Sequence, residues 1–111
     1  MRPTAPAELL PGTLDLLILR TLVRGSNHGY GIAQRVKELS RDVFLVGESS
    51  LYPALQRLTL DGYIKAEWGV SENNRRARFY TLTAAGRKQL AAERAEFERV
   101  VEAIRLVLEF A

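Results

Sequence analysis

The sequence predicts a mainly α-helical fold with one small β-hairpin and a long helix at its C-terminal end. Apolar residues recur at helical spacing in residues 13–23, 30–40 and 49–62, which indicates three amphipathic helices. The period changes to alternation in residues 63–68, and residues 78–82 are predicted as the partner strand. A heptad-like stripe from Leu90 to Val107 then predicts the long last helix.

The composition excludes several classes of protein. The chain has 111 residues, enough for one domain, with no cysteine and a single histidine. A disulfide framework and a thiolate or histidine-cluster metal site are therefore excluded, and no metal or cofactor is expected. No apolar run approaches the roughly 20 residues of a membrane span and no signal peptide is recognised, so we expect a cytoplasmic protein without a membrane partner. Without a placed nucleophile, base or metal, an enzyme is not expected.

The charge is more informative in its distribution than in its net value of +3. Residues 61–90 hold six Lys and Arg against three Asp and Glu, whereas residues 91–111 hold three against five. A basic centre suits contact with a nucleic acid, and the acidic C-terminal segment would face something else.

The first helix, with Thr13 as its expected cap, has apolar residues on more than one side. Leu14, Leu17, Ile18 and Leu22 form one stripe, and Leu16, Leu19 and Val23 form another. The core of one domain needs a single stripe. The second stripe is either packed under the same domain or buried against a second copy, and we favour the second copy. The glycine-rich residues 25–31 are predicted as a loop, in which His28 is expected to cap or pack rather than to react.

Within the segment 48–62 a short helix with one polar side is predicted, beginning at about Ser49 or Ser50. Ser49 or Ser50 would cap its start, Pro53 would lie in its first turn, and Asp61-Gly62 would end it. The inward residues are Leu51, Ala54, Leu55 and Leu58, and the polar side holds Ser49, Tyr52, Gln56 and Arg57. Such side chains can reach phosphates and base edges in a DNA groove, although an ordinary amphipathic surface helix would show the same pattern.

The hairpin follows directly, with its loop predicted over residues 69–77 and Asn73-Asn74 at the turn. Ile64, Ala66 and Trp68 would share one side, and Trp68 is predicted to be a core residue at the base of the hairpin. Arg75, Arg76 and Arg78 would be either solvated residues or a clamp for phosphates or a minor groove; three arginines within four positions favour the clamp.

The last helix is expected to begin after a Thr83 cap. Its stripe holds Leu90, Phe97, Val100, Ile104 and Val107, is widened by Val101 and Leu108, and is interrupted by Glu93. The stripe would either fold back on the first helix or be buried between two copies of the chain, and we favour the two copies.

This order of elements is the layout of a winged helix-turn-helix domain. The residues themselves resemble the PadR-like transcriptional regulators over nearly the whole chain, in the short branch with one helix after the wing. The motifs that carry the resemblance are Pro11-Gly-Thr-Leu-Asp-Leu-Leu-Ile-Leu19, His28-Gly-Tyr-Gly-Ile32, Glu48-Ser-Ser-Leu-Tyr-Pro-Ala-Leu55 with Arg57-Leu58 and Asp61-Gly62, Glu72-Asn-Asn-Arg-Arg76 and Tyr80-Thr-Leu-Thr-Ala-Ala-Gly-Arg87.

The resemblance implies a homodimer that represses transcription from a palindromic operator in double-stranded DNA. It places Ser49, Ser50, Tyr52 and Pro53 at the end of the recognition helix nearest the groove, and Asn74, Arg75 and Arg76 at the wing tip. Some relatives hold a planar drug between tryptophans of the C-terminal helix at the dimer interface. This chain has Phe97 and Phe110 in that helix, and its single tryptophan is Trp68. A drug-sensing repressor with an unknown inducer, and a winged helix that binds protein instead of DNA, stay open as alternatives.

We therefore divide the chain into an N-terminal arm of residues 1–11, a DNA-binding domain of residues 12–88 and a dimerisation helix of residues 89–111. The candidate DNA contacts are Ser49, Ser50, Tyr52, Pro53, Gln56, Arg57, Asn74, Arg75, Arg76 and Arg78. The candidate dimer contacts are Leu16, Leu19, Leu90, Phe97, Val100, Ile104 and Val107.

Overall fold

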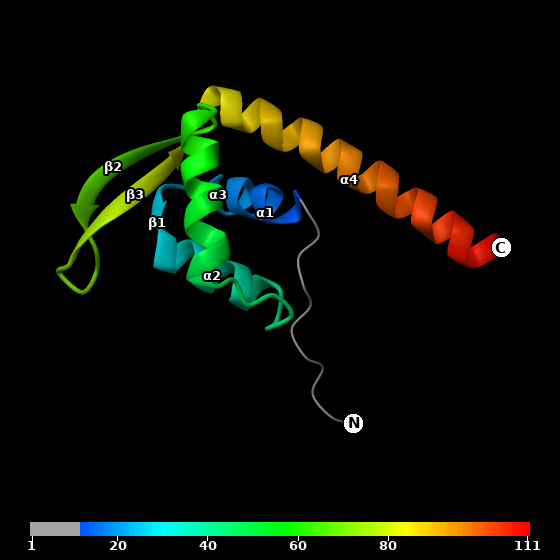
Figure 1. Ribbon diagram of the computed structural model, residues 1–111, viewed down its shortest axis with the longest axis horizontal. Coiled ribbons are helices and arrows are strands. Elements are labelled where there is room, and N and C mark those ends of the chain that lie inside the picture. Colours follow the sequence, from blue (N-terminus) through cyan, green and yellow to red (C-terminus); the bar gives the residue numbers. More distant parts are fainter. Residues whose placement is uncertain (1–11) are drawn as a thin grey trace.

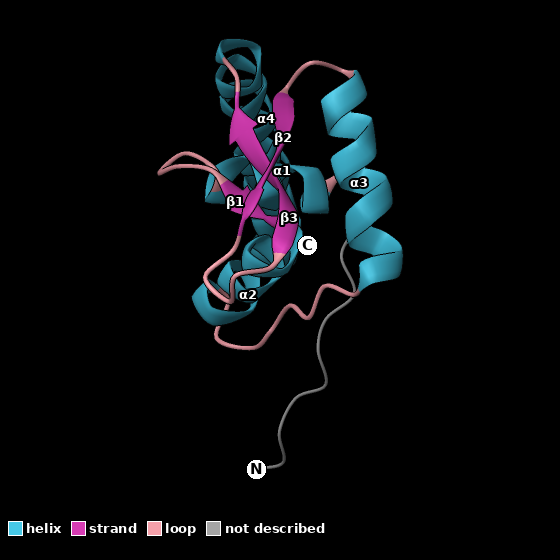
Figure 2. Cartoon of the chain, turned by 90° about the vertical axis from the view of Figure 1, so that its left-hand side faces the viewer, coloured by secondary structure: helices cyan, strands magenta, loops and turns pink. Residues whose placement is uncertain are grey.

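A computed structural model describes residues 12–111, so the predicted N-terminal arm lies outside the described residues. In this part of the chain four helices and three short strands follow one another in the order α1, β1, α2, α3, β2, β3, α4. Helices α1, α2 and α3 pack around one core, the β2–β3 hairpin lies beside α3, and α4 runs out from the domain (Figures 1 and 2). The predicted class, mainly α-helical with a hairpin that forms the wing, is confirmed.

Helix α1 spans Thr13–Thr21 and places one stripe of side chains in the core. Gly12, at a φ of 84°, occupies the N-cap position, so the prediction of a Thr13 cap is wrong. Ile18, Leu19 and Leu22 are fully or almost fully buried. The assignment of Leu19 to a second, outward stripe is therefore wrong: the buried side of α1 combines Ile18 and Leu22 of the first predicted stripe with Leu19 of the second.

A strand that the sequence analysis missed precedes the second helix. Strand β1, Asn27–His28, pairs antiparallel with β3, with Asn27 opposite Tyr80 and His28 opposite Phe79. Helix α2 then spans Gly29–Leu39, and the Gly31 N–H donates to Nδ1 of His28 at 3.0 Å. The expected capping role of His28 is thus confirmed. Leu39, the last residue of α2, is exposed.

Helix α3 spans Glu48–Leu60 and begins earlier than predicted. Gly47 is its N-cap and no side chain caps it, so the predicted serine cap is wrong. Pro53 consequently lies inside the helix, where it has no N–H to donate to the carbonyl of the preceding turn. The predicted end is confirmed, since Asp61 is the C-cap and Gly62 takes a φ of 78°.

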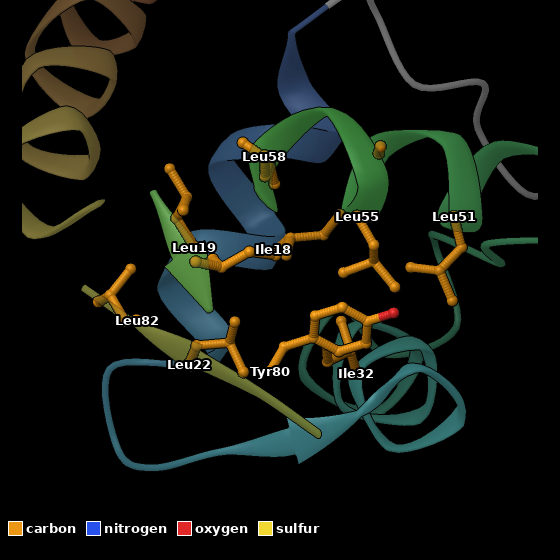
Figure 3. Close-up of a cluster of buried hydrophobic side chains, with 11 residues drawn as sticks. Ile18, Leu19, Leu22, Ile32, Leu51, Leu55, Leu58, Tyr80 and Leu82 are labelled. Atoms are coloured by element: carbon orange, nitrogen blue, oxygen red, sulfur yellow. The ribbon is translucent and has the colours of Figure 1, made fainter. Parts of the chain in front are cut away.

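The core forms where the inward side of α3 meets α1, α2 and the base of the hairpin (Figure 3). All four predicted inward residues of α3 are buried. The cluster consists of Ile18, Leu19, Leu22, Ile32, Leu51, Ala54, Leu55, Leu58, Ile64, Tyr80 and Leu82.

The hairpin consists of β2, Ile64–Val70, and β3, Arg76–Leu82, in a sheet of order β1-β3-β2. Its strands are longer than predicted, and only residues 71–75 remain as the loop, with Asn74 at a φ of 59°. Trp68 is 61% exposed, so the prediction that it is a core residue is wrong. The core covers this side of the sheet only at Ile64, Tyr80 and Leu82, and Trp68 lies beyond it.

Helix α4 spans Ala84–Phe110, and the predicted Thr83 cap is confirmed by a 3.0 Å hydrogen bond from the Gly86 N–H to its hydroxyl. The first turns pack on the domain, with Gly86 buried against the carbonyl of Tyr63. The rest of α4 extends away from the other elements (Figure 1). Among the helices of residues 12–111, none combines the length and the apolar character needed to cross a membrane.

Candidate nucleic-acid interface

The hairpin and α3 stand side by side (Figure 2). A groove of about 760 Å³ lies between their side chains. One wall comes from α3 and holds Tyr52, Gln56, Thr59 and Leu60. The other wall comes from the hairpin and holds Trp68, Arg76, Ala77 and Arg78. His28, Gly29, Tyr30 and Tyr80 complete the lining. The groove thus combines aromatic surface, amide and hydroxyl groups, and two guanidinium groups.

The α3 wall presents two of the predicted DNA contacts. Tyr52 is 48% exposed, and one edge of its ring lies so close to Gly29 that a Cβ there would be 3.2 Å from Cε1. Gln56 is exposed one turn further along. Ser49, Ser50 and Pro53 are exposed near the start of α3, outside the lining of the groove. The predicted outward side of α3 is therefore accessible, but only Tyr52 and Gln56 of the predicted α3 contacts face the groove.

Arg57 is held by the domain itself. Its Nη2 donates to Oδ1 of Asp15 in α1 at 2.6 Å, and the side chains of Arg57 and Asp15 are 54% and 17% exposed. This ion pair ties the last turns of α3 to α1. The structure thus separates Arg57 from Tyr52 and Gln56: its guanidinium group pairs with Asp15 of α1 and is absent from the groove lining, and its DNA contact stays a prediction.

The hairpin wall places the predicted arginines on different sides of the wing. Arg78 lines only the groove, Arg75 lines only a second hollow between the wing tip and α2, and Arg76 borders both. Asn74 lies at the turn of the wing, exposed and in the left-handed region. The sequence analysis missed Trp68, Tyr30 and His28 as groove residues. A signal for Trp68 was present, because alternation places it on the same side of the hairpin as its cross-strand neighbour Arg78.

Tyr80 is a buried residue of the groove lining, at 7% exposure. Burial raises the pKa of Tyr80, the positive charge of Arg78 lowers it, and the neighbouring Tyr52 raises it. Because the net direction is upward, Tyr80 is a neutral phenol that can donate a hydrogen bond at physiological pH.

A separate apolar surface lies on α4. Leu90 packs against the core, and together with Phe97 and the Leu16 and Leu17 side chains of α1 it lines a shallow hollow of about 330 Å³. Beyond it, Val100, Ile104 and Val107 share an apolar patch with Ala103 and Leu108. Six of the seven predicted dimer contacts are thus at least partly accessible. Leu19 is the exception, since its buried side chain cannot reach a second copy.

Glu93 lies where the apolar stripe of α4 passes α1. Burial raises its pKa, a hydrogen bond from Nε2 of Gln89 at 3.2 Å lowers it, and the carboxylate of Asp15 raises it. Its Oε2 is buried and has no hydrogen-bond partner within the described part of the chain.

The described part of the chain offers no candidate metal site. Residues 12–111 contain no group of three His, Cys, Asp or Glu placed to hold a metal ion.

Comparison with known proteins decides the family. The sequence model of the transcriptional regulator PadR-like family matches residues 18–92, more than half of the chain. The chain belongs to the PadR-like family. Its members are non-enzymatic DNA-binding regulators of transcription, which confirms the expectation that this PadR-like chain is not an enzyme.

Relatives and solved structures agree with this assignment. The transcriptional regulator Rv3488 of Mycobacterium tuberculosis is 35% identical over 97 residues, which cover 87% of each chain. The negative transcriptional regulator PadR of Bacillus subtilis is 31% identical over 69% of this chain but only 42% of its own length, so this chain spans less than half of that relative. A transcriptional regulator from Clostridium thermocellum superposes with a TM-score of 0.76 at 30% identity, covering 83% of this chain and 89% of its own.

Proposed function

We propose that this PadR-like chain is a homodimeric repressor that binds a palindromic operator through α3 and the wing. The observation that carries this proposal is the groove between α3 and the hairpin. Tyr52 and Gln56 on one wall can contact base edges or the backbone, while Arg76 and Arg78 on the other can bind phosphates. A protein-binding wing would gain more from an apolar tip than from three arginines within four positions.

The apolar patch on α4 supports the homodimer. Phe97, Val100, Ile104 and Val107 are all exposed, although their heptad spacing is typical of helices that pack against a second helix. A two-fold dimer would present two copies of α3 to one face of DNA, and a two-fold protein matches a palindromic site. The Bacillus subtilis relative is a negative transcriptional regulator, which favours repression.

Footprinting on the DNA upstream of the chain's own gene tests the operator. We expect two protected half-sites whose centres are about 34–36 Å apart, or a multiple of this distance. A single protected half-site, occupied by one chain, would contradict the palindromic mode.

A salt titration tests whether the wing contacts DNA. Each lost phosphate contact should flatten the slope of log affinity against log salt by about 0.9, so Arg75→Ala/Arg76→Ala should flatten it by up to about 1.8. Arg105→Ala is the control for the loss of one positive charge elsewhere: residue 105 lies in the last turns of α4, outside the groove lining, so its removal should leave the slope unchanged. An unchanged slope in the double variant would remove the wing tip from the interface.

The alternative of a drug held between tryptophans at the dimer interface has no observation in its favour. The single tryptophan, Trp68, lies on the wing and not on α4.

A further inference from the structure

One side of the β2–β3 hairpin changes from core to solvent along its length. The cross-strand pairs Ile64–Leu82, Ala66–Tyr80, Trp68–Arg78 and Val70–Arg76 all project from the same side. Ile64, Tyr80 and Leu82 are buried, whereas Trp68, Val70, Arg76 and Arg78 are exposed. The large indole of Trp68 is thus exposed to solvent on the side of the wing that faces α3. Burial in the core does not explain its presence there.

The indole of Trp68 is in contact with two positive charges. The guanidinium carbon of Arg76 lies 4.6 Å from the centre of the Trp68 ring, and that of Arg78 lies 5.8 Å from it. Both distances fall within the range of about 6 Å for a cation–π interaction. Within residues 12–111 neither arginine forms an ion pair. The nearest acidic residue along β2, Glu67, projects from the other side of the hairpin and pairs with Lys65.

This arrangement reduces the freedom of two side chains that would otherwise move in solvent. An exposed arginine loses rotamer entropy when it binds a phosphate, and this loss weakens binding. An arginine that already lies against an indole has lost part of that freedom before binding. Stacking leaves the edge of a guanidinium group, with its N–H donors, free for a phosphate.

We propose that Trp68 is a positioning residue for DNA, which holds Arg76 and Arg78 against the α3-facing side of the wing so that they grip the phosphates of one DNA strand seated in the groove. The proposal rests on the proposed DNA binding and adds the occupant of the groove and a role for Trp68. The occupant follows from the chemistry of the walls: the two unpaired guanidinium groups of the hairpin suit the phosphates of a strand, and Tyr52 and Gln56 of α3 suit its sugars and bases.

The fluorescence of Trp68 tests this proposal. Because Trp68 is the only tryptophan of the chain, all tryptophan fluorescence of the protein comes from it. The DNA is a short mixed-sequence duplex at low salt, since phosphate contacts need no operator. Binding is followed independently by the anisotropy of a dye on the duplex. We expect acrylamide quenching of Trp68 to fall when the duplex is bound, because DNA in the groove would cover an indole that is 61% exposed in the free protein. Unchanged quenching in a complex that anisotropy shows to be formed would overturn the proposal.

Variants separate positioning from direct contact. Trp68→Ala should bind the duplex about two- to fivefold more weakly, the change expected for an exposed cation–π interaction, and should flatten the salt slope. Trp68→Phe, which keeps a weaker ring, should fall between Trp68→Ala and the wild type. Val70→Ala is the matched control: Val70 is exposed on the same side of the hairpin but holds no cation, so its removal should leave affinity and slope unchanged.

A double-mutant cycle completes the test. In a chain that already carries Arg76→Ala and Arg78→Ala, the further change Trp68→Ala should have no effect, because nothing is left to position. Fully additive losses would overturn the positioning role. If the wild-type chain fails to bind any duplex, the proposed function is wrong as well. If it binds normally while Trp68→Ala matches it in affinity and slope, only the role of Trp68 is wrong. Thermal melting of each variant checks that it is folded.

Discussion

Replacing Ile104 by glutamate tests the proposed dimer at its centre. Ile104 is 50% exposed in the single chain and lies in the stripe of Phe97, Val100 and Val107. Leu106 is also 50% exposed, but two residues further along the helix it points to nearly the opposite side. The pair Ile104→Glu and Leu106→Glu therefore introduces the same charge at the same initial exposure on two sides of α4.

The expected loss follows from the exposed half of the Ile104 side chain. Burying a whole isoleucine side chain contributes about 1.5–3 kcal/mol, so covering the exposed half contributes about 0.75–1.5 kcal/mol per copy. Each substitution is present in both copies of a symmetric dimer. Ile104→Glu should therefore reduce the free energy of dimerisation by at least about 1.5–3 kcal/mol, which raises the dissociation constant about 10- to 150-fold. Desolvation of the two new carboxylates in the dimer interface adds to this loss.

Sedimentation equilibrium measures the dissociation constants of the wild type and the two variants, and circular dichroism shows whether each is folded. We expect a wild-type dimer at micromolar concentration, a largely monomeric Ile104→Glu and a nearly unaffected Leu106→Glu. A wild-type monomer would refute the dimer. Equal dissociation constants of the two variants would show that the dimer interface does not follow the heptad stripe.

Three further predictions concern the domain itself. Tyr52→Ala should leave the melting temperature nearly unchanged and weaken operator binding by about 1–3 kcal/mol. Leu55→Ala, at a fully buried site, should instead destabilise the fold by about 2–5 kcal/mol and lose binding only as folding is lost. The opposite pattern would place Tyr52 in the core. Gly86→Ala should lower the melting temperature by about 4 °C or more, because the new Cβ would collide with the Tyr63 carbonyl, although alanine favours a helix by about 1 kcal/mol; a higher melting temperature would contradict this. Glu93→Gln should stabilise the protein at neutral pH but not below the ordinary glutamate pKa of 4.5. The pKa of Glu93 is raised in the folded state, so the wild type loses stability as the pH rises through that folded-state pKa, and the glutamine variant does not. Thermal melts across this pH range measure the difference, and a variant less stable than the wild type at neutral pH would contradict the prediction.

The sequence alone determined the features that depend on local periodicity and local chemistry. The buried stripe of α3, the Thr83 cap and the Gly62 helix end could all be predicted from residues within a few positions of one another. Helical spacing states which side of a segment faces a core, and a small set of residue types suits each helix end. The motifs that resemble the PadR-like family are equally local, and the family match confirmed them.

Only the tertiary structure decided how far the core extends and which polar side chains find a partner inside the chain. Alternation correctly placed Trp68 on the inward side of the hairpin, but the packed elements cover that side only at its base, so Trp68 became groove surface. The two residues of β1 are too few to show a period, and they form a strand only because β3 lies beside them. Arg57 has the same helical spacing whether or not it has a partner inside the chain, and only the packing of α1 places Asp15 within reach of it. Period and propensity are properties of a segment, whereas burial and ion pairing depend on what the rest of the chain places next to it.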